Sequence, residues 1–257
     1  MILDDIVAAT RKRVTLLKEN QTLIQLENRL PQETPRPFKA ALRHESRLGL
    51  IAEIKRASPS KGLIAPDFSV EKMAAQYRDG GADCLSVLTE PDFFQGHDAY
   101  LCQARDVSGL PVLRKDFVID AIQIAEARLL GADCILLIVS ILRDWEIRAF
   151  KAAAHRYGMD ALVEIHDESE AQRALANGCD FVGINNRDLK NFAVDMTTTE
   201  RLRPLLPPSV TVVGESGIVT RGDANLLRSC GADAILVGES LMKSGDVGAS
   251  IKELLEV

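Results

Sequence analysis

A short repeat constrains the fold of this 257-residue chain more than any other feature of its sequence. The tripeptide Gly-Ala-Asp or a near copy occurs four times, roughly 50 residues apart. Each copy follows a helical pattern and precedes a short apolar run, so its glycine suits the left-handed conformation that ends a helix. One strand–helix unit takes roughly 25 to 30 residues, so each repeat holds two units and four repeats predict eight strands. The copies are Gly81-Ala82-Asp83, Gly131-Ala132-Asp133, Gly178-Cys179-Asp180 and Gly231-Ala232-Asp233.

The eight strands can also be found one by one as short apolar runs. Runs this apolar are typical of parallel strands that are covered on both faces. Amphipathic helical segments lie between them, at residues 70–78, 121–130, 144–157 and 168–176. Eight alternating units predict an α/β fold, a single (β/α)8 TIM barrel, in preference to the alternative of a doubly wound open sheet. The predicted strands are residues 50–54, 84–88, 112–115, 134–139, 161–165, 181–184, 210–214 and 234–238.

Residues 1–47 precede the first predicted strand. They hold a helical pattern followed by a proline-rich stretch with Pro31, Pro35 and Pro37. This segment is too small to be a domain of its own, so we expect one domain, residues 1–257, in which residues 1–47 are an N-terminal extension. Its apolar positions need a surface to bury against, and we expect it to cover part of the mouth of the barrel.

Composition and charge narrow the class of protein. The longest apolar run, residues 134–139, is far shorter than the roughly 20 residues that cross a bilayer. A formal net charge of -6 gives no attractive field for nucleic acid. The five cysteines form no Cys-x-x-Cys pair, and we expect no secretion signal because no basic region followed by an apolar stretch stands near the first residues. We therefore expect a monomeric cytoplasmic protein whose partner is a small-molecule substrate, with no nucleic-acid or membrane partner.

Charged and amide side chains close most of the predicted strands. In a (β/α)8 barrel the carboxyl ends of the strands and the loops after them carry the chemistry. Members of a pair that lie two residues apart, such as Glu53 and Lys55, share one face of a strand. Charges beside such apolar runs need each other or a ligand, although a solvated loop rim is the alternative. The strand-end residues are Glu53, Lys55, Glu90, Lys115, Glu164, Asn185, Arg187 and Glu215.

Small, glycine-rich loops follow the last two predicted strands, at residues 214–218 and 237–240. Glycine lets backbone N–H groups approach an anion, and these two loops are the usual phosphate site of the fold. Glycines that merely serve tight turns are the alternative. The loop from Lys55 to Gly62, which includes Ser60 and Lys61, adds cationic and hydroxyl groups over the mouth. These loops predict an anionic, phosphate-bearing ligand.

The histidines, the cysteines and the single tryptophan show no spacing that indicates a metal site or a catalytic site. The histidines at positions 44, 97, 155 and 166 are dispersed, with no metal-ligand spacing, so no metal site is predicted. Trp145 is expected to pack against the barrel, and each cysteine is expected to be a buried spacer. The sequence lacks the glycine-rich motifs of nucleotide-binding folds.

Several long motifs resemble those of the indole-3-glycerol-phosphate synthase family, over nearly the whole chain. The resemblance implies the monofunctional form, a carboxy-lyase of tryptophan biosynthesis that needs no metal or organic cofactor. Its reaction converts 1-(2-carboxyphenylamino)-1-deoxyribulose 5-phosphate into indole-3-glycerol phosphate, with release of CO₂ and water. The matching motifs are residues 51–62 (IAEIKRASPSKG), 111–117 (PVLRKDF), Glu164, 183–189 (GINNRDL), 215–218 (ESGI) and 237–242 (VGESLM).

The resemblance also implies roles for the matched residues. Lys115 would be the general acid that protonates the ketone oxygen as the ring closes, and Glu164 the general base for the later dehydration. Lys55 would assist through the substrate carboxylate and the departing hydroxyl, and Glu53 would orient the lysines. The remaining implied catalytic residues, which would position the substrate hydroxyls, are Asn185 and Glu215.

The implied substrate-binding residues fall into three groups. One walls the aromatic ring, one lines the mouth, and one offers backbone N–H groups to the phosphate. Because a carboxylate beside a phosphate repels it, the side chain of Glu239 is expected to point away while its backbone contributes. The residues are Ser58, Pro59, Phe94, Phe117, Leu136, Arg187, Leu189, Ser216, Gly217, Leu236, Gly238 and Glu239.

Two other functions remain open at the level of sequence. One is a Schiff-base aldolase on a phosphosugar, with Lys115 as the nucleophile. The other is a ligand-binding barrel without catalytic activity.

Overall fold

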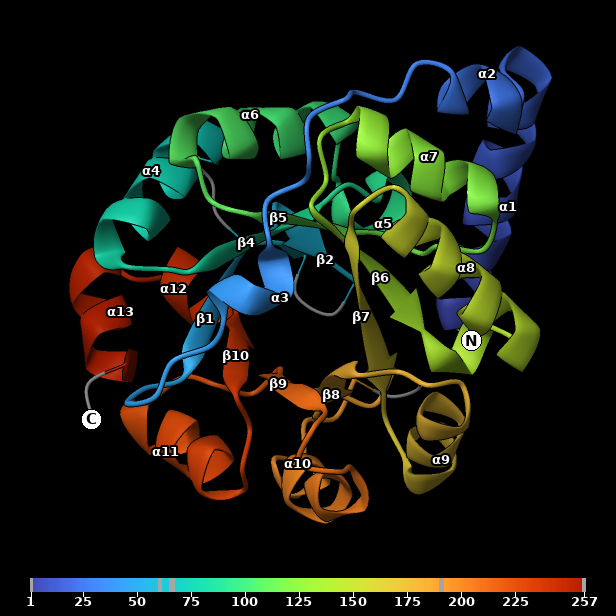
Figure 1. Cartoon of the computed structure of the whole chain (residues 1–257). Coiled ribbons are helices and arrows are strands. Elements are labelled where there is room, and N and C mark those ends of the chain that lie inside the picture. The colour runs from blue at the N-terminus through green and yellow to red at the C-terminus, as the bar shows by residue number, and fades with distance from the viewer. Residues whose placement is uncertain (1, 60–61, 65–67, 190–191, 256–257) are drawn as a thin grey trace.

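Eight parallel strands close into a barrel in the computed structural model of the chain, which describes residues 2–59, 62–64, 68–189 and 192–255. The order of the strands around the barrel is β1-β10-β9-β8-β7-β6-β5-β4, and helices surround it (Figure 1). Each of the eight predicted strands is present, and its ends lie within one residue of those expected. The strands are β1 (Gly49–Ile54), β4 (Cys84–Leu88), β5 (Val112–Lys115), β6 (Cys134–Ile138), β7 (Asp160–Ile165), β8 (Phe181–Asn185), β9 (Thr211–Glu215) and β10 (Ala234–Val237).

Helices occupy the connections between the strands and the space before β1. The last helix, α13, packs beside α4, so the ring of helices closes where the chain ends (Figure 1). A short hairpin, β2 (Ala57–Ser58) with β3 (Gly62–Leu63), follows β1. The helices are α1 (Ile2–Asn20), α2 (Leu23–Glu27), α3 (Phe38–Ala41), α4 (Val70–Gly80), α5 (Pro91–Phe94), α6 (Asp98–Ser108), α7 (Ala121–Leu129), α8 (Asp144–Arg156), α9 (Glu168–Ala176), α10 (Thr197–Leu202), α11 (Arg221–Ser229), α12 (Glu239–Met242) and α13 (Val247–Leu255), with 3-10 turns η1 (Val139–Ile141) and η2 (Arg203–Leu205).

The Gly-Ala-Asp repeat has a physical explanation in the junction from helix to strand. Its four glycines all have positive φ angles, between 66° and 96°, and so end the preceding helices. The residue after each glycine is buried, and in three copies the aspartate accepts a hydrogen bond from a backbone N–H near the start of the preceding strand. These bonds are Leu50 N to Asp83 (2.8 Å), Val112 N to Asp133 (2.9 Å) and Val212 N to Asp233 (2.7 Å). In the remaining copy, Gly178-Cys179-Asp180, the carboxylate of the aspartate instead pairs with Lys39.

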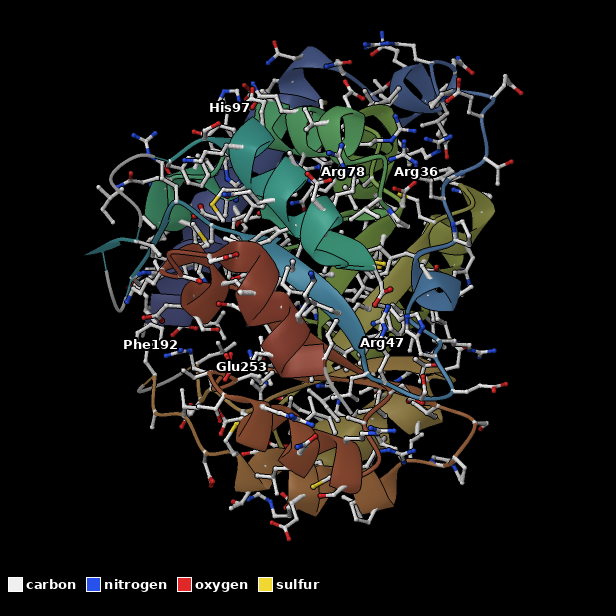
Figure 2. All side chains as sticks on the ribbon, turned by 90° about the vertical axis from the view of Figure 1, so that its left-hand side faces the viewer. Arg36, Arg47, Arg78, His97, Phe192 and Glu253 are labelled. Carbon is white, nitrogen blue, oxygen red and sulfur yellow. The ribbon has the colours of Figure 1, made fainter. Side chains whose placement is uncertain are left out.

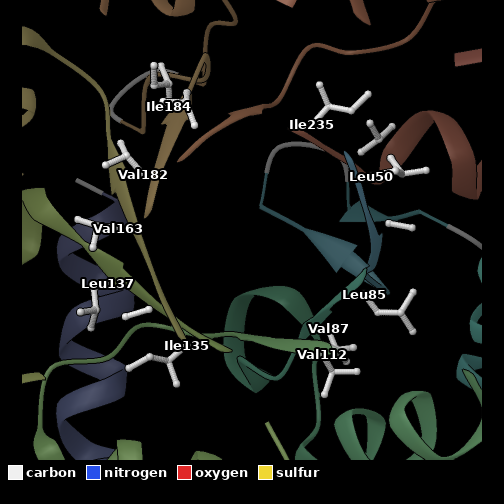
Figure 3. Packing of buried hydrophobic residues seen from close by; sticks show 14 of the residues in the cluster. Leu50, Leu85, Val87, Val112, Ile135, Leu137, Val163, Val182, Ile184 and Ile235 are labelled. Carbon is white, nitrogen blue, oxygen red and sulfur yellow. The ribbon is translucent and has the colours of Figure 1, made fainter. Parts of the chain in front are cut away.

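Two apolar clusters share the strands because alternate side chains point to opposite faces. The outer cluster fills the space between the strands and the helices; Figure 3 shows members such as Leu50, Val112 and Val182. The inner cluster fills the barrel and includes Ile51, Leu162 and Val213. Toward the carboxyl ends the inward positions become polar and charged. These inward polar residues are Glu53, Lys115, Glu164, Asn185 and Glu215.

The N-terminal extension contacts the barrel in two places. Near the amino ends of the strands, Phe38 and Leu42 are fully buried, and the ring of Phe38 lies 6.2 Å from that of Phe181. At the other end, α1 contacts α5, and Ile6 belongs to the same apolar cluster as Phe117. In the side view of Figure 2, Arg36 lies toward the end opposite to that of Phe192.

A partly buried ion-pair network joins α1 to the end of β5. The guanidinium of Arg13 donates to both carboxylate oxygens of Asp116, at 3.2 and 3.4 Å, and lies 3.6 Å from Glu90. Asp116 directly follows Lys115 and also accepts a hydrogen bond from Thr89. The extension thus docks at the mouth end of the barrel as well as at the amino ends of the strands, but no described residue of 2–47 lines the cavity itself.

No helix in the described ranges combines the length and the apolar character that a membrane span requires. Among the five cysteines, all described and unpaired, Cys84, Cys134 and Cys179 are buried as expected, whereas Cys102 and Cys230 are only partly buried. Trp145 does not pack as expected, because it lies on α8 with 54% of its surface exposed.

Replacing Phe38 with alanine tests whether the extension and the barrel unfold as one unit. Loss of a fully buried phenylalanine costs about 3–5 kcal/mol. We expect Phe38→Ala to lower the urea midpoint of the whole barrel, followed by far-ultraviolet circular dichroism. Leu16→Ala, at an exposed position of α1, is the control and should change stability by less than about 0.5 kcal/mol. An unchanged midpoint in Phe38→Ala would mean that the extension folds separately.

Candidate active site

A cavity of about 720 Å³ opens at the carboxyl ends of the barrel strands. All of the catalytic and substrate-binding residues predicted from the sequence line it, from Glu53 on β1 to Glu239 on α12. Ser60 and Lys61 lie outside the described residues. Lining residues that the sequence did not single out are Leu88, Asp116, Ile138, Phe192, Val194, Val219 and Lys243.

The ammonium group of Lys115 forms the centre of the charged layer. Its Nζ lies 3.0 Å from Oε2 of Glu164 on β7 and 2.7 Å from Oε2 of Glu215 on β9. Burial acts to lower the pKa of Lys115, but the charges of the surrounding carboxylates outweigh this effect and raise the pKa above its ordinary value. Lys115 is therefore a cation at neutral pH, held between two potential proton acceptors.

The two carboxylates that contact Lys115 have opposite pKa shifts. Burial acts to raise the pKa of Glu164, but Lys115 and His166 outweigh it and hold the pKa well below its usual range. In Glu215, burial raises the pKa further than Lys115 lowers it, and the nearby charge of Glu164 adds to the increase. Two like carboxylates that share one cation thus differ in proton affinity, which suits different roles in proton transfer.

Space for the Glu215 carboxylate comes from a glycine on the neighbouring strand. A Cβ atom at Gly183 of β8 would lie 2.1 Å from Oε1 of Glu215. This oxygen is buried and has no hydrogen-bond partner among the described residues. An unpaired buried acceptor is costly unless a ligand satisfies it, so Oε1 of Glu215 is a site at which a bound hydroxyl can donate.

Glu53 and Lys55 contact each other at the opposite side of the barrel. Lys55 Nζ donates to Oε1 of Glu53, as the i, i+2 spacing along the strand predicted. Glu53 is buried, whereas Lys55 is part-exposed toward the cavity. Lys55 is thus a cation available at the mouth, anchored by a buried carboxylate.

The loop after β8 holds its polar residues through its own backbone. Asn185 Oδ1 accepts from the backbone N–H of Arg187 at 3.0 Å, and the guanidinium of Arg187 donates to the carbonyl of Phe192 at 3.1 Å. Asn186 does not line this cavity, but it donates to the carbonyl of Ser216 at 3.2 Å and so links the loops after β8 and β9. Asn185 and Arg187 both line the cavity, so these contacts fix two of its polar side chains.

The predicted phosphate loops lie together on one side of the cavity. After β9, Ser216 and Gly217 have φ angles of 66° and 84°. After β10, Gly238 precedes α12, whose first residue is Glu239. The carboxylate of Glu239 accepts from Lys243 Nζ at 2.7 Å, one turn along the helix, so a cation accompanies this negative charge.

Apolar side chains form the wall next to these polar groups. The rings of Phe94 and Phe117 lie 6.2 Å apart, and Leu136 and Leu189 belong to the same apolar cluster or pack against it. These side chains line the cavity together with the charged layer.

Two residues behave differently from the sequence-based expectation. Glu90 ends a strand as the others do, but it does not line the cavity: its carboxylate accepts from three backbone N–H groups at the start of α5. His166 showed no metal-ligand pattern, yet its Nε2 lies 3.2 Å from Oε1 of Glu164. The i, i+2 spacing of Glu164 and His166, the same signal that paired Glu53 with Lys55, could have revealed it.

Comparison with known sequences identifies the family. The sequence model of the family described as indole-3-glycerol phosphate synthase matches residues 3–254. The chain belongs to the indole-3-glycerol phosphate synthase family. It is 46% identical over 256 residues to the indole-3-glycerol phosphate synthase of Desulfotalea psychrophila, covering 98% of each chain. It is also 46% identical over 257 residues to that of Ruminiclostridium cellulolyticum, covering 99% of this chain and 98% of the relative.

Solved structures with the same fold are more distant in sequence. A 3-hexulose-6-phosphate synthase from Salmonella typhimurium superposes with a TM-score of 0.62 at 12% identity, over 80% of this chain and 96% of the other. A thiamine phosphate pyrophosphorylase from Pyrococcus furiosus gives a TM-score of 0.61 at 16% identity, over 84% and 95%. These similarities concern the barrel fold alone.

Substituting Gly183 with alanine tests the space that Glu215 needs. The added Cβ would overlap Oε1 of Glu215, so we expect the carboxylate to move and its contact with Lys115 to lengthen beyond 2.7 Å. Overpacking of this kind costs about 1–3 kcal/mol. A crystal structure of the variant and its melting temperature measure both effects. Gly245→Ala is the control, because its Cβ would meet nothing within 4 Å; an unmoved Glu215 in Gly183→Ala would contradict the interpretation.

Proposed function

We propose that this chain catalyses the indole-3-glycerol phosphate synthase reaction, with Lys115 as the general acid, Glu164 as the general base and Glu215 as a residue that positions the substrate hydroxyls. The reaction closes a ring, releases CO₂ and eliminates water to form indole-3-glycerol phosphate. Membership of the family supports the activity. The observation that carries the residue assignment is the buried ammonium of Lys115, held 3.0 Å from Glu164 and 2.7 Å from Glu215 in the cavity.

The phosphate of the substrate binds to the loops after β9 and β10 in this proposal. The backbone N–H groups of Gly217, Gly238 and Glu239 are its donors, since both loops border the cavity. The carboxylate of Glu239 is paired with Lys243, which reduces its repulsion of the phosphate. The ribulose chain then extends from these loops toward the charged layer at the centre of the barrel.

The aromatic end of the substrate lies against the apolar wall. Phe94 and Phe117 contact the anilino ring, and Lys55 pairs with the substrate carboxylate. A cation at that carboxylate aligns the ring carbon with the ketone, and such positioning can supply a large part of the rate enhancement.

Ring closure places negative charge on the ketone oxygen. Lys115 donates a proton to that oxygen as the ring carbon attacks the ketone carbon. Its raised pKa keeps the proton available at neutral pH until a developing alkoxide, a much stronger base, competes for it. Aromatic stabilisation returns when CO₂ leaves the attacked ring carbon.

Dehydration then completes the indole. Glu164 removes a proton from the intermediate, and Lys55 assists the hydroxyl that departs as water. Asn185 hydrogen-bonds to one of the remaining hydroxyls, and Oε1 of Glu215 accepts a hydrogen bond from another. This contact gives the buried oxygen of Glu215 a partner.

The charge state of Lys115 argues against a Schiff-base aldolase. An imine forms only from a neutral amine, whereas the carboxylates around Lys115 raise its pKa and keep it protonated. Borohydride with substrate should therefore leave no covalent adduct on Lys115.

Cellular location and assembly complete the proposal. Five unpaired cysteines support a cytoplasmic location, in a reducing compartment. The monomeric state stays a prediction, which light scattering of the purified protein measures.

Turnover by the purified protein tests the function directly. Folded protein supplied with 1-(2-carboxyphenylamino)-1-deoxyribulose 5-phosphate should produce the indole chromophore, followed by absorbance or fluorescence. Absence of turnover under conditions where the protein is folded would overturn the proposal.

Substitutions at Lys115 and Glu164 test the two proton transfers separately. Lys115→Ala and Glu164→Gln should each lower kcat by at least about 10²-fold, the lower range for positioned proton transfer. Lys115→Arg should bind substrate but lose most turnover, because arginine keeps its proton. In a single turnover, Glu164→Gln should still release CO₂, whereas Lys115→Ala should not. Lys72→Ala, on an exposed face of α4, is the control; near-normal kcat in Lys115→Ala would exclude it as the acid.

A further inference from the structure

His166 lies directly after β7 and connects the charged layer to helix α9. Its Nε2 is 3.2 Å from Oε1 of Glu164, and its Nδ1 is 3.0 Å from Oε2 of Glu170. The backbone N–H of His166 donates to the same Glu170 oxygen at 2.8 Å. The ring is thus held between two carboxylates, one in the cavity and one behind it.

The charged groups around His166 come from four elements. Glu164 on β7 and Glu170 on α9 face the ring directly, and Lys115 on β5 and Glu215 on β9 act on it through Glu164. Only 14% of the His166 side chain is exposed, and His166 does not line the cavity. Any effect of this residue on the reaction therefore passes through Glu164.

We propose that His166, fixed by Glu170, is a positioning residue that holds the carboxylate of Glu164 in place and in its charged form. The inference rests on the proposed role of Glu164 as the general base. His166 would keep the carboxylate of Glu164 aligned while Lys115, the other partner of Glu164, donates its proton to the substrate.

The two oxygens of Glu164 have different partners, and this division carries the inference. Oε2 contacts Lys115, and Oε1 contacts His166. When Lys115 donates its proton to the ketone oxygen, Oε2 loses a cationic partner and becomes free to face the substrate. Oε1 keeps its partner because His166 is bonded to Glu170 on α9 rather than to the substrate, so their ion pair opposes rotation of the carboxylate.

The charges in and around the cavity also support a role for His166 in keeping Glu164 ionised. The carboxyl groups in and behind this layer, Glu53, Glu164, Glu170 and Glu215, outnumber the two lysines that contact them, Lys55 and Lys115. Burial acts to lower the pKa of His166, but Glu164 and Glu170 outweigh it and raise the pKa to about 10. The ring is therefore an imidazolium at neutral pH, with a proton on each nitrogen. Nδ1 hydrogen-bonds to Glu170, whereas Nε2 forms an ion pair with Glu164 that lacks the geometry of a hydrogen bond. This third cation keeps Glu164 ionised, as a base requires.

Replacing His166 with glutamine removes the charge and keeps a side-chain amide donor. Because an opposite charge close to a carboxylate lowers its pKa, loss of the imidazolium should raise the pKa of Glu164. We expect the acidic limb of the pH profile of kcat to move up by about one pH unit. We also expect kcat at neutral pH to fall about tenfold from misalignment, with KM changed less than about twofold.

Three further variants separate this role from simple packing. Glu170→Gln frees the ring but leaves it protonated in acid, so kcat should fall while the acidic limb stays in place. Glu168→Gln, whose carboxylate pairs with Arg201 on the surface, is the matched control on the same helix and should behave as the wild type. In the Glu164→Gln background, His166→Gln should lower single-turnover rates little further, because both act through one group.

The outcomes distinguish this inference from the proposed function. An inactive wild-type protein contradicts the proposed function itself. If the wild type is active, two results overturn the role of His166 alone. One is a His166→Gln variant whose kcat and acidic limb are unchanged. The other is a variant whose kcat falls and whose KM rises while the acidic limb of its pH profile stays in place. Melting temperatures show that each variant is folded.

Discussion

The buried ammonium of Lys115 is the interaction on which the rest of the site depends. A cation in this position is tolerated only because Glu164 and Glu215 contact it, and neither carboxylate would stay charged so deep in the barrel without a cation. Gly183 leaves space for the carboxylate of Glu215, and His166 contacts Oε1 of Glu164. The apolar interior beneath strengthens these electrostatic contacts because it excludes water.

The barrel and most of the cavity residues could be predicted from the sequence because their signals are local. Apolar runs mark the strands, the Gly-Ala-Asp copies mark where they begin, and parallel strands necessarily gather their carboxyl ends at one mouth. Pairs two residues apart, such as Glu53 and Lys55, already share a face within a single strand.

Contacts that depend on distant segments could not be predicted in this way. Glu90 ends its strand as Glu164 does, but the turn into α5 directs its carboxylate to backbone N–H groups instead of the cavity. Arg13 reaches Asp116 across more than a hundred residues of sequence, and no local pattern encodes that pairing. Trp145 is exposed because its position on α8 faces away from the barrel, which a helical pattern alone leaves undecided.

The aspartates of the repeat carry a consequence for the opposite end of the barrel. Three of these aspartates, each just before a strand, accept a hydrogen bond from a backbone N–H near the start of the preceding strand, at Leu50, Val112 and Val212. A slip of one residue in any of these pairings would exchange the inward and outward faces of a strand. The strands are only four to six residues long. The hydrogen bond at the start of a strand therefore also determines which side chains at its other end point into the cavity. In this molecule the alignment of the reacting groups is therefore set about one strand length away from them, by residues that no substrate touches.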